Sequence, residues 1–278
     1  MTFEEFVREA ETNILDYLPK EINEKTHEVR INKVRKNQDQ IFHGLSILPR
    51  QSDGTALSPS IYLEEFYKEY KDGEPFPCIL REVAEMYLNA VRNTSQIGDI
   101  PKLLSDYNWV KTRFQIRACD TKMNQERIKD IMHITQGPIT GLVYVVVDDD
   151  PGHFSSTPVT KQLFEMWGVT KDQLIQDVME SNKNFGVLLY RFAEILYCLT
   201  NKVKLNGAGL IFNKDVMDNI HDEIGDFYIL PYSIHECMIV PFSAGISYDE
   251  LKDMVRDANA VVVEDANILS NEIMEYRK

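Results

Sequence analysis

The sequence has few cysteines, and their spacing argues against two common kinds of site. Cys78, Cys119, Cys198 and Cys237 are widely scattered along 278 residues, with no Cys-x-x-Cys pair. A disulfide framework or a cysteine zinc site would need closer or more regular spacing. We therefore expect four reduced thiols, most of them buried.

The sequence also lacks a long hydrophobic run and a secretory signal. No apolar stretch approaches the ~20 residues that a membrane-spanning helix needs. The opening residues, MTFEEFVREAET, are acidic, whereas a secretory signal is basic and then apolar. We expect a cytoplasmic protein without membrane association.

Positive charge is scarce, since 30 Lys and Arg residues stand against 44 Asp and Glu residues, a net charge of −14. An acidic surface repels phosphate backbones, which makes direct nucleic-acid binding unlikely without a local basic face. The visible basic segment is KTHEVRINKVRKN, residues 25–37, which we interpret as a two-stranded ribbon with a solvated cationic face. The acidity also permits a different function, an acidic nucleic-acid mimic that inhibits a basic partner.

The composition is that of a globular protein, with 44% hydrophobic and 27% charged residues. The length indicates one large or two medium domains. We expect an α+β fold with an amino-terminal α+β region over residues 1–135 and a carboxy-terminal α+β region over residues 136–278. The boundary, at TQGPITG, is loose, and the two regions can also form one compact unit.

The amino-terminal region is expected to begin with a helix, because Thr2 and Glu5 form a capping box before an apolar stripe. The next segments, HEVRINKVRK and QIFHGLSILP, predict a β-hairpin. Two helices follow, IYLEEFYKEY and the amphipathic stretch from Ile79 to Val91. Residues 103–121 mix helix and strand signals and yield no prediction.

The carboxy-terminal region is expected to form a mixed, mostly antiparallel sheet with packed helices. Its helices are capped at Thr160, Thr170 and Ser247, and a further helix, KDVMDNIHDEI, ends at Gly225. The predicted strands are GLVYVVV, EILYCLT, AGLIF, DFYILP, HECMIVP and AVVVED, with NEIMEYR as a final edge strand.

Several stretches together resemble an uncharacterised bacterial family, a domain of unknown function. They are LTNKVKLNGAGLIF, DFYILPYSIHECMIVPF, SYDELKDMVRDAN, NILDYLP, GLSILP, IYLEEFY and MWGVTKDQL, so the resemblance covers nearly the full chain. It implies family membership, and it implies no activity, cofactor or catalytic residue. The interval between MESNKNFG and YCLTNK is shorter than we expect for relatives.

The segment SIHEC places His235 and Glu236 at the start of a predicted strand. Because side chains alternate along a strand, the two should point to opposite faces. Both faces are otherwise apolar, so each polar group needs a partner. We favour a structural role, in which Glu236 accepts hydrogen bonds and His235 anchors a loop. The alternative makes one of them a catalytic or ligand-binding group.

Two nucleophiles near His235 are considered. In a strand, Cys237 would lie ~6.5–7 Å along the chain from His235, too far for a thiolate–imidazole contact. Ser233 lies in the turn after Pro231, without the spacing of a nucleophile elbow. Neither arrangement predicts covalent catalysis.

The segment DDDPGH, residues 148–153, is the candidate metal site. Asp148 and Asp150 could supply the oxygen ligands that magnesium or manganese prefers, and His153 a nitrogen. The same residues are also strong turn formers, and we favour a solvated hairpin turn. A metal site would need a second acidic source, for which HDEIGD, residues 221–226, is available.

Gly207 and Gly209, in LNGAGLIF, could let a phosphate approach backbone amides. However, the lysine of a phosphate loop is absent and no helix is expected directly after them. We interpret both glycines as part of a tight turn or bulge entering a strand.

No complete catalytic constellation is visible, and no cofactor is predicted. Our leading hypothesis is a non-catalytic cytoplasmic binding or interaction protein with a protein partner. The alternative is a hydrolase or phosphotransferase assisted by magnesium or manganese.

Overall fold

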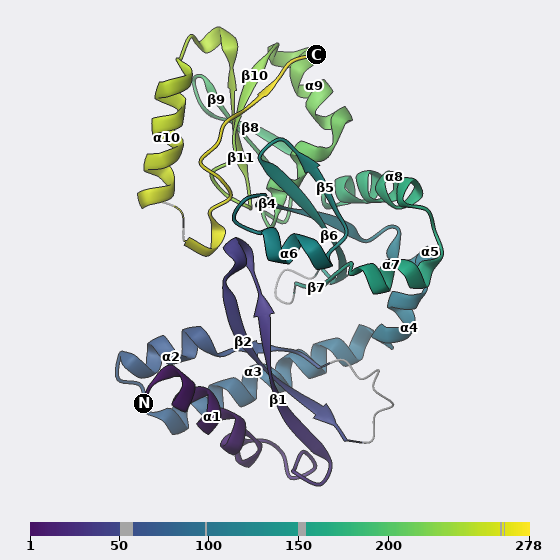
Figure 1. Cartoon of the computed structure of the whole chain (residues 1–278), viewed down its shortest axis with the longest axis vertical. Helices are drawn as coiled ribbons and strands as arrows, with labels where there is room; N and C mark the ends of the chain where they lie inside the picture. Colours follow the sequence, from purple (N-terminus) through teal and green to yellow (C-terminus); the bar gives the residue numbers. More distant parts are fainter. Residues whose placement is uncertain (51–57, 98, 150–153, 262, 264) are drawn as a thin grey trace. The chain divides into compact units, whose positions relative to one another are not determined.

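The computed structural model describes residues 1–50, 58–97, 99–149, 154–261, 263 and 265–278 (Figure 1). It contains two compact units, one made of residues 1–36 and 40–104 and the other of residues 37–39 and 105–278. Both combine helices with antiparallel sheets, which confirms the α+β prediction. Within the described ranges, no helix has the length and apolar character needed to cross a membrane.

The first unit packs helices on a three-stranded antiparallel sheet of order β1-β2-β3. The predicted hairpin is confirmed, with β1 and β2 paired from His27↔Pro49 to Arg35↔Ile41. The predicted capping box is also present, since Glu5 and Thr2 bond each other's backbone N–H. Its elements are α1 (Phe3–Asn13), η1 (Ile14–Tyr17), β1 (His27–Arg35), β2 (Ile41–Pro49), β3 (Ile61–Tyr62), α2 (Leu63–Lys71), α3 (Phe76–Ile97) and α4 (Ile100–Ser105), whose last residue belongs to the second unit.

The core of the first unit lies between the hairpin and the helices. Apolar side chains from α1, β2, α2 and α3 are almost completely inaccessible to solvent, among them Phe6, Leu45, Leu63 and Ile79. At about 25 cal/mol per Å² of buried apolar surface, such side chains contribute ~1.5–3 kcal/mol each to folding. The amphipathic stripe of α3 therefore determines which face of this helix packs on the sheet.

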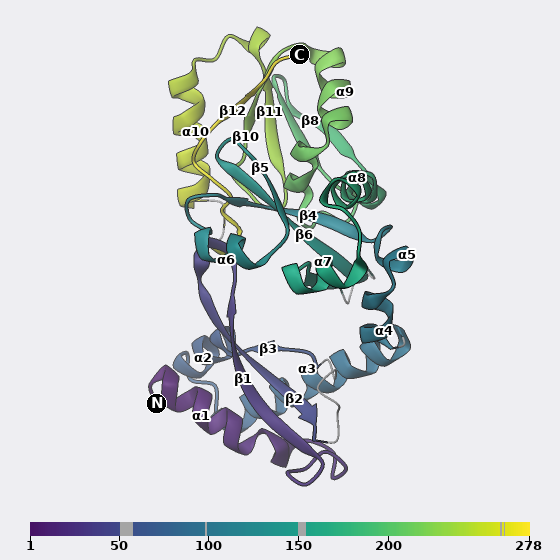
Figure 2. The same cartoon turned by 45° about the vertical axis from the view of Figure 1, so that its right-hand side comes forward.

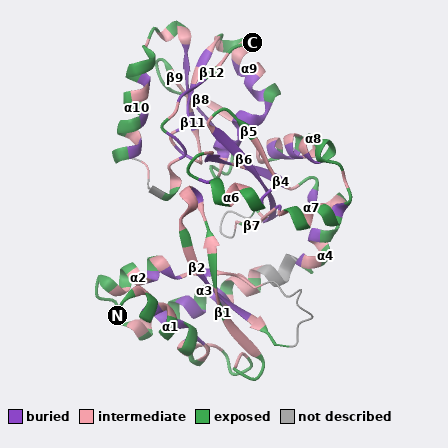
Figure 3. Ribbon diagram, in the orientation of Figure 1, coloured by how far each residue is buried: buried purple, intermediate pink, exposed green. Residues whose placement is uncertain are grey.

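The second unit begins with a sheet built around β6 (Ile139–Asp148). β4 and β5 pair with β6 on opposite edges, and β7 pairs with its end. The first nine residues of β6 are buried, as its apolar sequence predicts (Figure 3). The domain boundary predicted from the sequence, between residues 135 and 136, falls within β5 of this sheet. The elements around it are η2 (Asn37–Asp39), α5 (Tyr107–Val110), β4 (Phe114–Asp120), α6 (Gln125–Asp130), β5 (His133–Gln136), β7 (Ser155–Pro158), α7 (Lys161–Trp167) and α8 (Lys171–Asn182).

A second, five-stranded antiparallel sheet has the order β12-β10-β11-β9-β8. Helices α9 and α10 lie on its opposite faces (Figures 1 and 2). The predicted last strand is confirmed as an edge strand, because β10 is the one described strand with which β12 pairs. The elements are η3 (Lys183–Phe185), β8 (Leu188–Ala193), β9 (Leu196–Thr200), η4 (Gly207–Phe212), α9 (Lys214–Ile224), β10 (Phe227–Leu230), β11 (Cys237–Pro241), η5 (Phe242–Ala244), α10 (Tyr248–Val261), η6 (Asp265–Asn267) and β12 (Met274–Tyr276).

Two buried asparagines connect β4 with α8 and η4 in the second unit. The Asn182 side chain accepts the N–H of Ile116 in β4 at 2.9 Å and donates to Gly209 and Asn213. Asn213 in turn donates to the backbone carbonyl of Met179 in α8. Because both asparagine side chains are buried, losing one partner would leave buried polar groups unsatisfied.

The structure corrects two predicted strands. AGLIF lies within the 3-10 helix η4, whose Gly209 packs closely against the backbone of Ile116 in β4. Ala260 and Val261, at the start of AVVVED, complete α10. The ambiguous residues 103–121 resolve into the end of α4, then α5 and β4, and β8 is a strand that the sequence analysis did not single out.

Candidate functional site

His235 and Glu236 lie in the turn before β11, which begins at Cys237, so the strand geometry expected for them is wrong. The chain leaves the sheet here because it pairs with another loop. Ser233 forms an isolated bridge with Ile268, and the N–H of Ile234 donates to the carbonyl of Asn267. The side chains of His235 and Glu236 are therefore placed by loop contacts.

The His235 ring connects two loops. Its Nδ1 accepts the backbone N–H of Asn206 at 3.2 Å, and its Nε2 lies 3.2 Å from Oδ1 of Asn267. A neutral imidazole with its proton on Nε2 satisfies both contacts. The carbonyl of His235 also accepts the Thr200 hydroxyl at 2.8 Å. These bonds fix the turn before β11.

The Glu236 carboxylate receives two side-chain donors. Oε1 accepts the hydroxyl of Tyr232, and Oε2 accepts the thiol of Cys198 at 3.3 Å. Burial and the bond to Glu236 raise the pKa of Tyr232. Burial raises the pKa of Cys198 to about 11, and a hydrogen bond with Cys198 raises that of Tyr190 to about 12. At neutral pH all three donors are protonated, and a network runs from Tyr232 through Glu236 and Cys198 to Tyr190.

Neither considered nucleophile has an activated geometry. Cys237 is fully buried, and burial raises the pKa of its thiol, so the reactive thiolate is not populated at neutral pH. The Ser233 hydroxyl accepts the N–H of His235 at 3.1 Å and is itself buried. Both side chains stabilise the segment that carries them.

Gly207 and Gly209 allow two pieces of backbone to approach closely. A Cβ at Gly209 would lie 2.0 Å from the carbonyl oxygen of Ile116, and one at Gly207 would lie 2.6 Å from that of His235. Both glycines are buried within η4. The space that a phosphate would need is filled by protein backbone.

Of the candidate metal ligands, Asp148 is the last residue of β6 and pairs in register with Ser155 of β7. Asp150 and His153 lie outside the described residues. The proposed second acidic source is engaged elsewhere, since His221 Nε2 lies 2.9 Å from Asp226 Oδ1 and Asp222 binds Lys278. Among the residues with a described position, no three His, Cys, Asp or Glu side chains are grouped to hold a metal ion.

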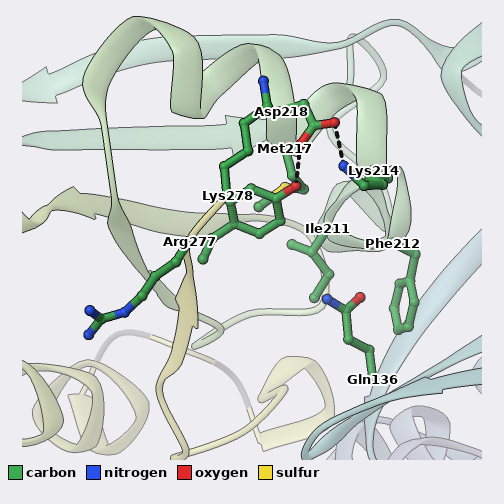
Figure 4. A pocket seen from close by; sticks show the side chains of 9 residues that line it. Gln136, Ile211, Phe212, Lys214, Met217, Asp218, Arg277 and Lys278 are labelled. Carbon is green, nitrogen blue, oxygen red and sulfur yellow. Dashed lines mark hydrogen bonds and ion pairs between the residues drawn. The ribbon is translucent and has the colours of Figure 1, made fainter.

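A pocket of about 470 Å³ lies beside α9 and β12. Its floor is apolar, and its rim carries charges that are already paired (Figure 4). Asp218 accepts the ammonium of Lys214 at 2.6 Å and the hydroxyl of Tyr276 at 2.7 Å. Arg277 binds Glu275. This pocket therefore offers shape and apolar contact more than unbalanced charge.

A feature missed by the sequence analysis is the β8 hairpin, which we define as residues 186–205. Six large hydrophobic side chains are exposed within it: Val187, Tyr190, Phe192, Ile195, Val203 and Leu205. Phe192 has the largest exposed fraction of the six, 62%. The strand alternation of this stretch could have been noticed, but its exposure depends on β8 being at the edge of the sheet.

The edge position follows from the pairing. In the part of the chain that the structure describes, β8 pairs with β9 alone, from Leu188↔Thr200 to Ala193↔Leu196, with a bulge between Arg191 and Ala193. The Glu236 network reaches this edge, because its last member, Tyr190, belongs to β8. The candidate residue Glu236 is thus connected through hydrogen bonds to an exposed apolar strand.

Comparison with protein families matches residues 3–195 and 183–278 to the model of one family, described as a family of unknown function (DUF5688). The two matched segments overlap at residues 183–195, a range that includes most of the interval, residues 187–196, whose length we expected to be shorter than in relatives. Comparisons with curated proteins and with solved structures found no match.

Proposed function

This chain belongs to the DUF5688 family of unknown function, and we propose that it is a non-catalytic cytoplasmic protein that binds a protein partner through the β8 hairpin. The single observation that carries the proposal is the exposure of six hydrophobic side chains in the β8 hairpin, two of which, Tyr190 and Phe192, lie on the edge strand itself. A concentration of exposed hydrophobic side chains in one short segment often marks an interaction site.

The state of the polar candidates supports a binding role. His235 anchors two loops, Glu236 receives two donors, and the thiols of Cys198 and Cys237 have raised pKa values. A catalytic group needs access to substrate and a pKa suited to proton transfer or attack. These residues instead support the sheet whose edge is exposed.

Site-directed photocrosslinking tests the proposal. Benzoylphenylalanine replaces Phe192 in one variant and Met166 of α7 in a second, and each is irradiated in a lysate of cells that naturally contain the protein. The two positions are matched, because Phe192 is 62% exposed and Met166 is 60% exposed. We expect one discrete crosslinked protein from position 192 that position 166 does not give.

The crosslink should also disappear when unlabelled wild-type chain is added in excess. Identical crosslinking patterns at the two positions would contradict the proposal, because β8 would then be no more an interaction surface than α7.

A further inference from the structure

The β8 hairpin differs from the rest of the chain in charge. It contains three basic residues, Arg191, Lys202 and Lys204, and one acidic residue, Glu194, which give it a net charge of +2. Since the whole chain has a net charge of −14, the residues outside the hairpin together carry −16. Within the described part of the protein, none of these three cations forms an ion pair with a side chain. The Arg191 guanidinium donates to the backbone carbonyl of Glu194. The hairpin is therefore a basic and apolar segment in an acidic protein.

The position of one cation is fixed by packing. A Cβ on Gly186 would lie 2.6 Å from Cγ of Lys202, so the lysine stem lies over the start of the hairpin. Gly186 itself has a φ of +78°, which suits glycine. Lys202 thus presents its ammonium beside the chain that enters β8.

Besides the charged and apolar side chains, the backbone of β8 can also take part in recognition. In an antiparallel pair, alternate residues bond the neighbouring strand and the others direct their N–H and C=O groups away from it. Since β8 has β9 on one side and, among the described residues, no strand on the other, part of its backbone faces outward. The bulge after Arg191 limits the regular part of this edge to Leu188, Leu189, Tyr190 and Arg191.

We propose that the β8 edge binds an extended acidic peptide segment of a partner protein by strand addition; this rests on the proposed function above. Backbone hydrogen bonds to β8 would provide affinity, as in other cases of strand addition. Apolar side chains of the peptide would contact Tyr190 and Phe192. Its acidic side chains would lie near Arg191, Lys202 and Lys204, which also select against basic segments.

Two other occupants fit the surface less well. An anionic membrane could contact the cations and apolar side chains of the hairpin. However, the net charge of −16 on the rest of the chain would repel the membrane, and the backbone groups at the β8 edge would form no hydrogen bonds with it. A second copy would place two equally basic hairpins beside each other, which like charges disfavour. Both occupants are outcomes of the test.

The test uses the full chain and fluorescent synthetic peptides that alternate valine with glutamate. Their binding is followed by fluorescence anisotropy at low and high salt, beside a valine–lysine peptide and a valine–glutamate peptide interrupted by prolines. We expect the uninterrupted acidic peptide to bind, with an affinity that falls as salt rises, and the other two to bind more weakly. Prolines remove the N–H groups that strand addition uses.

Charge reversal then locates the site. The double variant Lys202→Glu with Lys204→Glu should bind the acidic peptide about five- to tenfold more weakly, since exposed charge pairs contribute ~0.2–1 kcal/mol each. The control, Lys161→Glu with Lys171→Glu, changes the net charge equally at two exposed lysines outside the hairpin and should bind as wild type. Equal melting temperatures would show that both variants fold.

Hydrogen exchange on the same samples separates the occupants. Slower exchange at Leu188–Arg191 in the presence of the acidic peptide supports the proposal. Binding of phosphatidylserine vesicles in place of peptide would overturn it in favour of a membrane, and concentration-dependent dimerisation with protection of β8 would overturn it in favour of a second copy. If no peptide binds while position 192 still crosslinks a discrete protein, the acidic-peptide inference fails and the proposed binding function stands.

Discussion

The two edges of the five-stranded sheet are opposite in character. β12 is short, and its last side chain is engaged within the molecule: Tyr276 stacks on Phe227 at 5.2 Å and donates to Asp218. The next residue, Arg277, lies over the ring of Phe242 at 4.6 Å. β8 is longer, and its last four residues are exposed. Side chains at the end of β12 therefore contact other parts of the protein, whereas those at the end of β8 face solvent.

This difference is the reason that we propose β8, and not β12, as the edge that binds a partner. Folded proteins protect strand edges with short strands, charges or bulges, because unpaired edges associate with other chains. β12 has both shortness and charge. β8 has a bulge, and the β8 hairpin has three cations; the bulge limits pairing to a short stretch, and the cations favour partners of opposite charge. An edge with limited protection of this kind favours selective binding over aggregation.

The largest expected difference between the two edges is in stability. Met274 of β12 is 9% exposed, and Met274→Ala should lower the free energy of unfolding by ~2 kcal/mol through the lost burial and the cavity. Phe192→Ala on β8 should change it by less than about 0.5 kcal/mol. Urea unfolding of both variants measures the difference, and equal destabilisation would refute the distinction.

A smaller loss of stability is expected on changing Glu236, which is connected through Cys198 to Tyr190 of β8. In Glu236→Gln, an NH2 group replaces one of the two carboxylate oxygens. This NH2 group lies beside either the Tyr232 hydroxyl or the Cys198 thiol, both of which donate to Glu236 in the wild type. A buried donor left without an acceptor costs about 1–3 kcal/mol, so we expect a loss near the lower end by urea unfolding. An unchanged stability would mean that the network contributes nothing to the fold.

The same network should be visible in the ionisation of Tyr190. The hydrogen bond with Cys198 is the main reason that the pKa of Tyr190 is raised to about 12. Cys198→Ala removes this bond and should lower that pKa towards 10, as measured by ultraviolet titration of tyrosinate. Tyr190→Phe identifies the signal, and a titration curve of Cys198→Ala that matches wild type would contradict the contact.

The smallest expected effect is the pH dependence of the stability that Asp218, the partner of Tyr276 in β12, provides. The ammonium of Lys214 and the hydroxyl of Tyr276 hold the pKa of Asp218 below its ordinary value of 3.8. A lowered folded-state pKa stabilises the protein above the unfolded value, and this stabilisation is lost as the pH falls through the folded-state pKa. Wild type should therefore be slightly more stable than Asp218→Asn at neutral pH, with the difference vanishing in acid. Urea unfolding across this pH range provides the measurement, and a difference that persists in acid would exclude the carboxylate as its source.

Much of the fold could be predicted because its signals are local. The caps at Thr2, Thr160, Thr170 and Ser247 form as predicted, since each depends on residues three positions apart. The β1–β2 hairpin and the buried β6 follow from patterns within a few residues. AGLIF was misassigned because its form depends on Gly209 meeting β4, a contact distant in sequence.

The candidate site shows the same limit. Strand alternation predicted that His235 and Glu236 point apart, but the long-range pairing of Ser233 with Ile268 keeps both residues in the turn before β11, which begins only at Cys237. Their partners, Asn206, Asn267 and Cys198, come from three separate segments. No spacing rule joins such residues before the chain has folded.

The sequence by itself determined the α+β class, the acidic net charge, the helix caps and the family resemblance, because each depends on composition or on neighbours along the chain. Only the tertiary structure decided that β8 lies at an edge, that Glu236 connects to it through Cys198, and that within the described residues the cations of the β8 hairpin form no ion pair with a side chain. The physical reason is that exposure and pairing belong to the arrangement of strands in the sheet. The same apolar residues in a central strand would have been core.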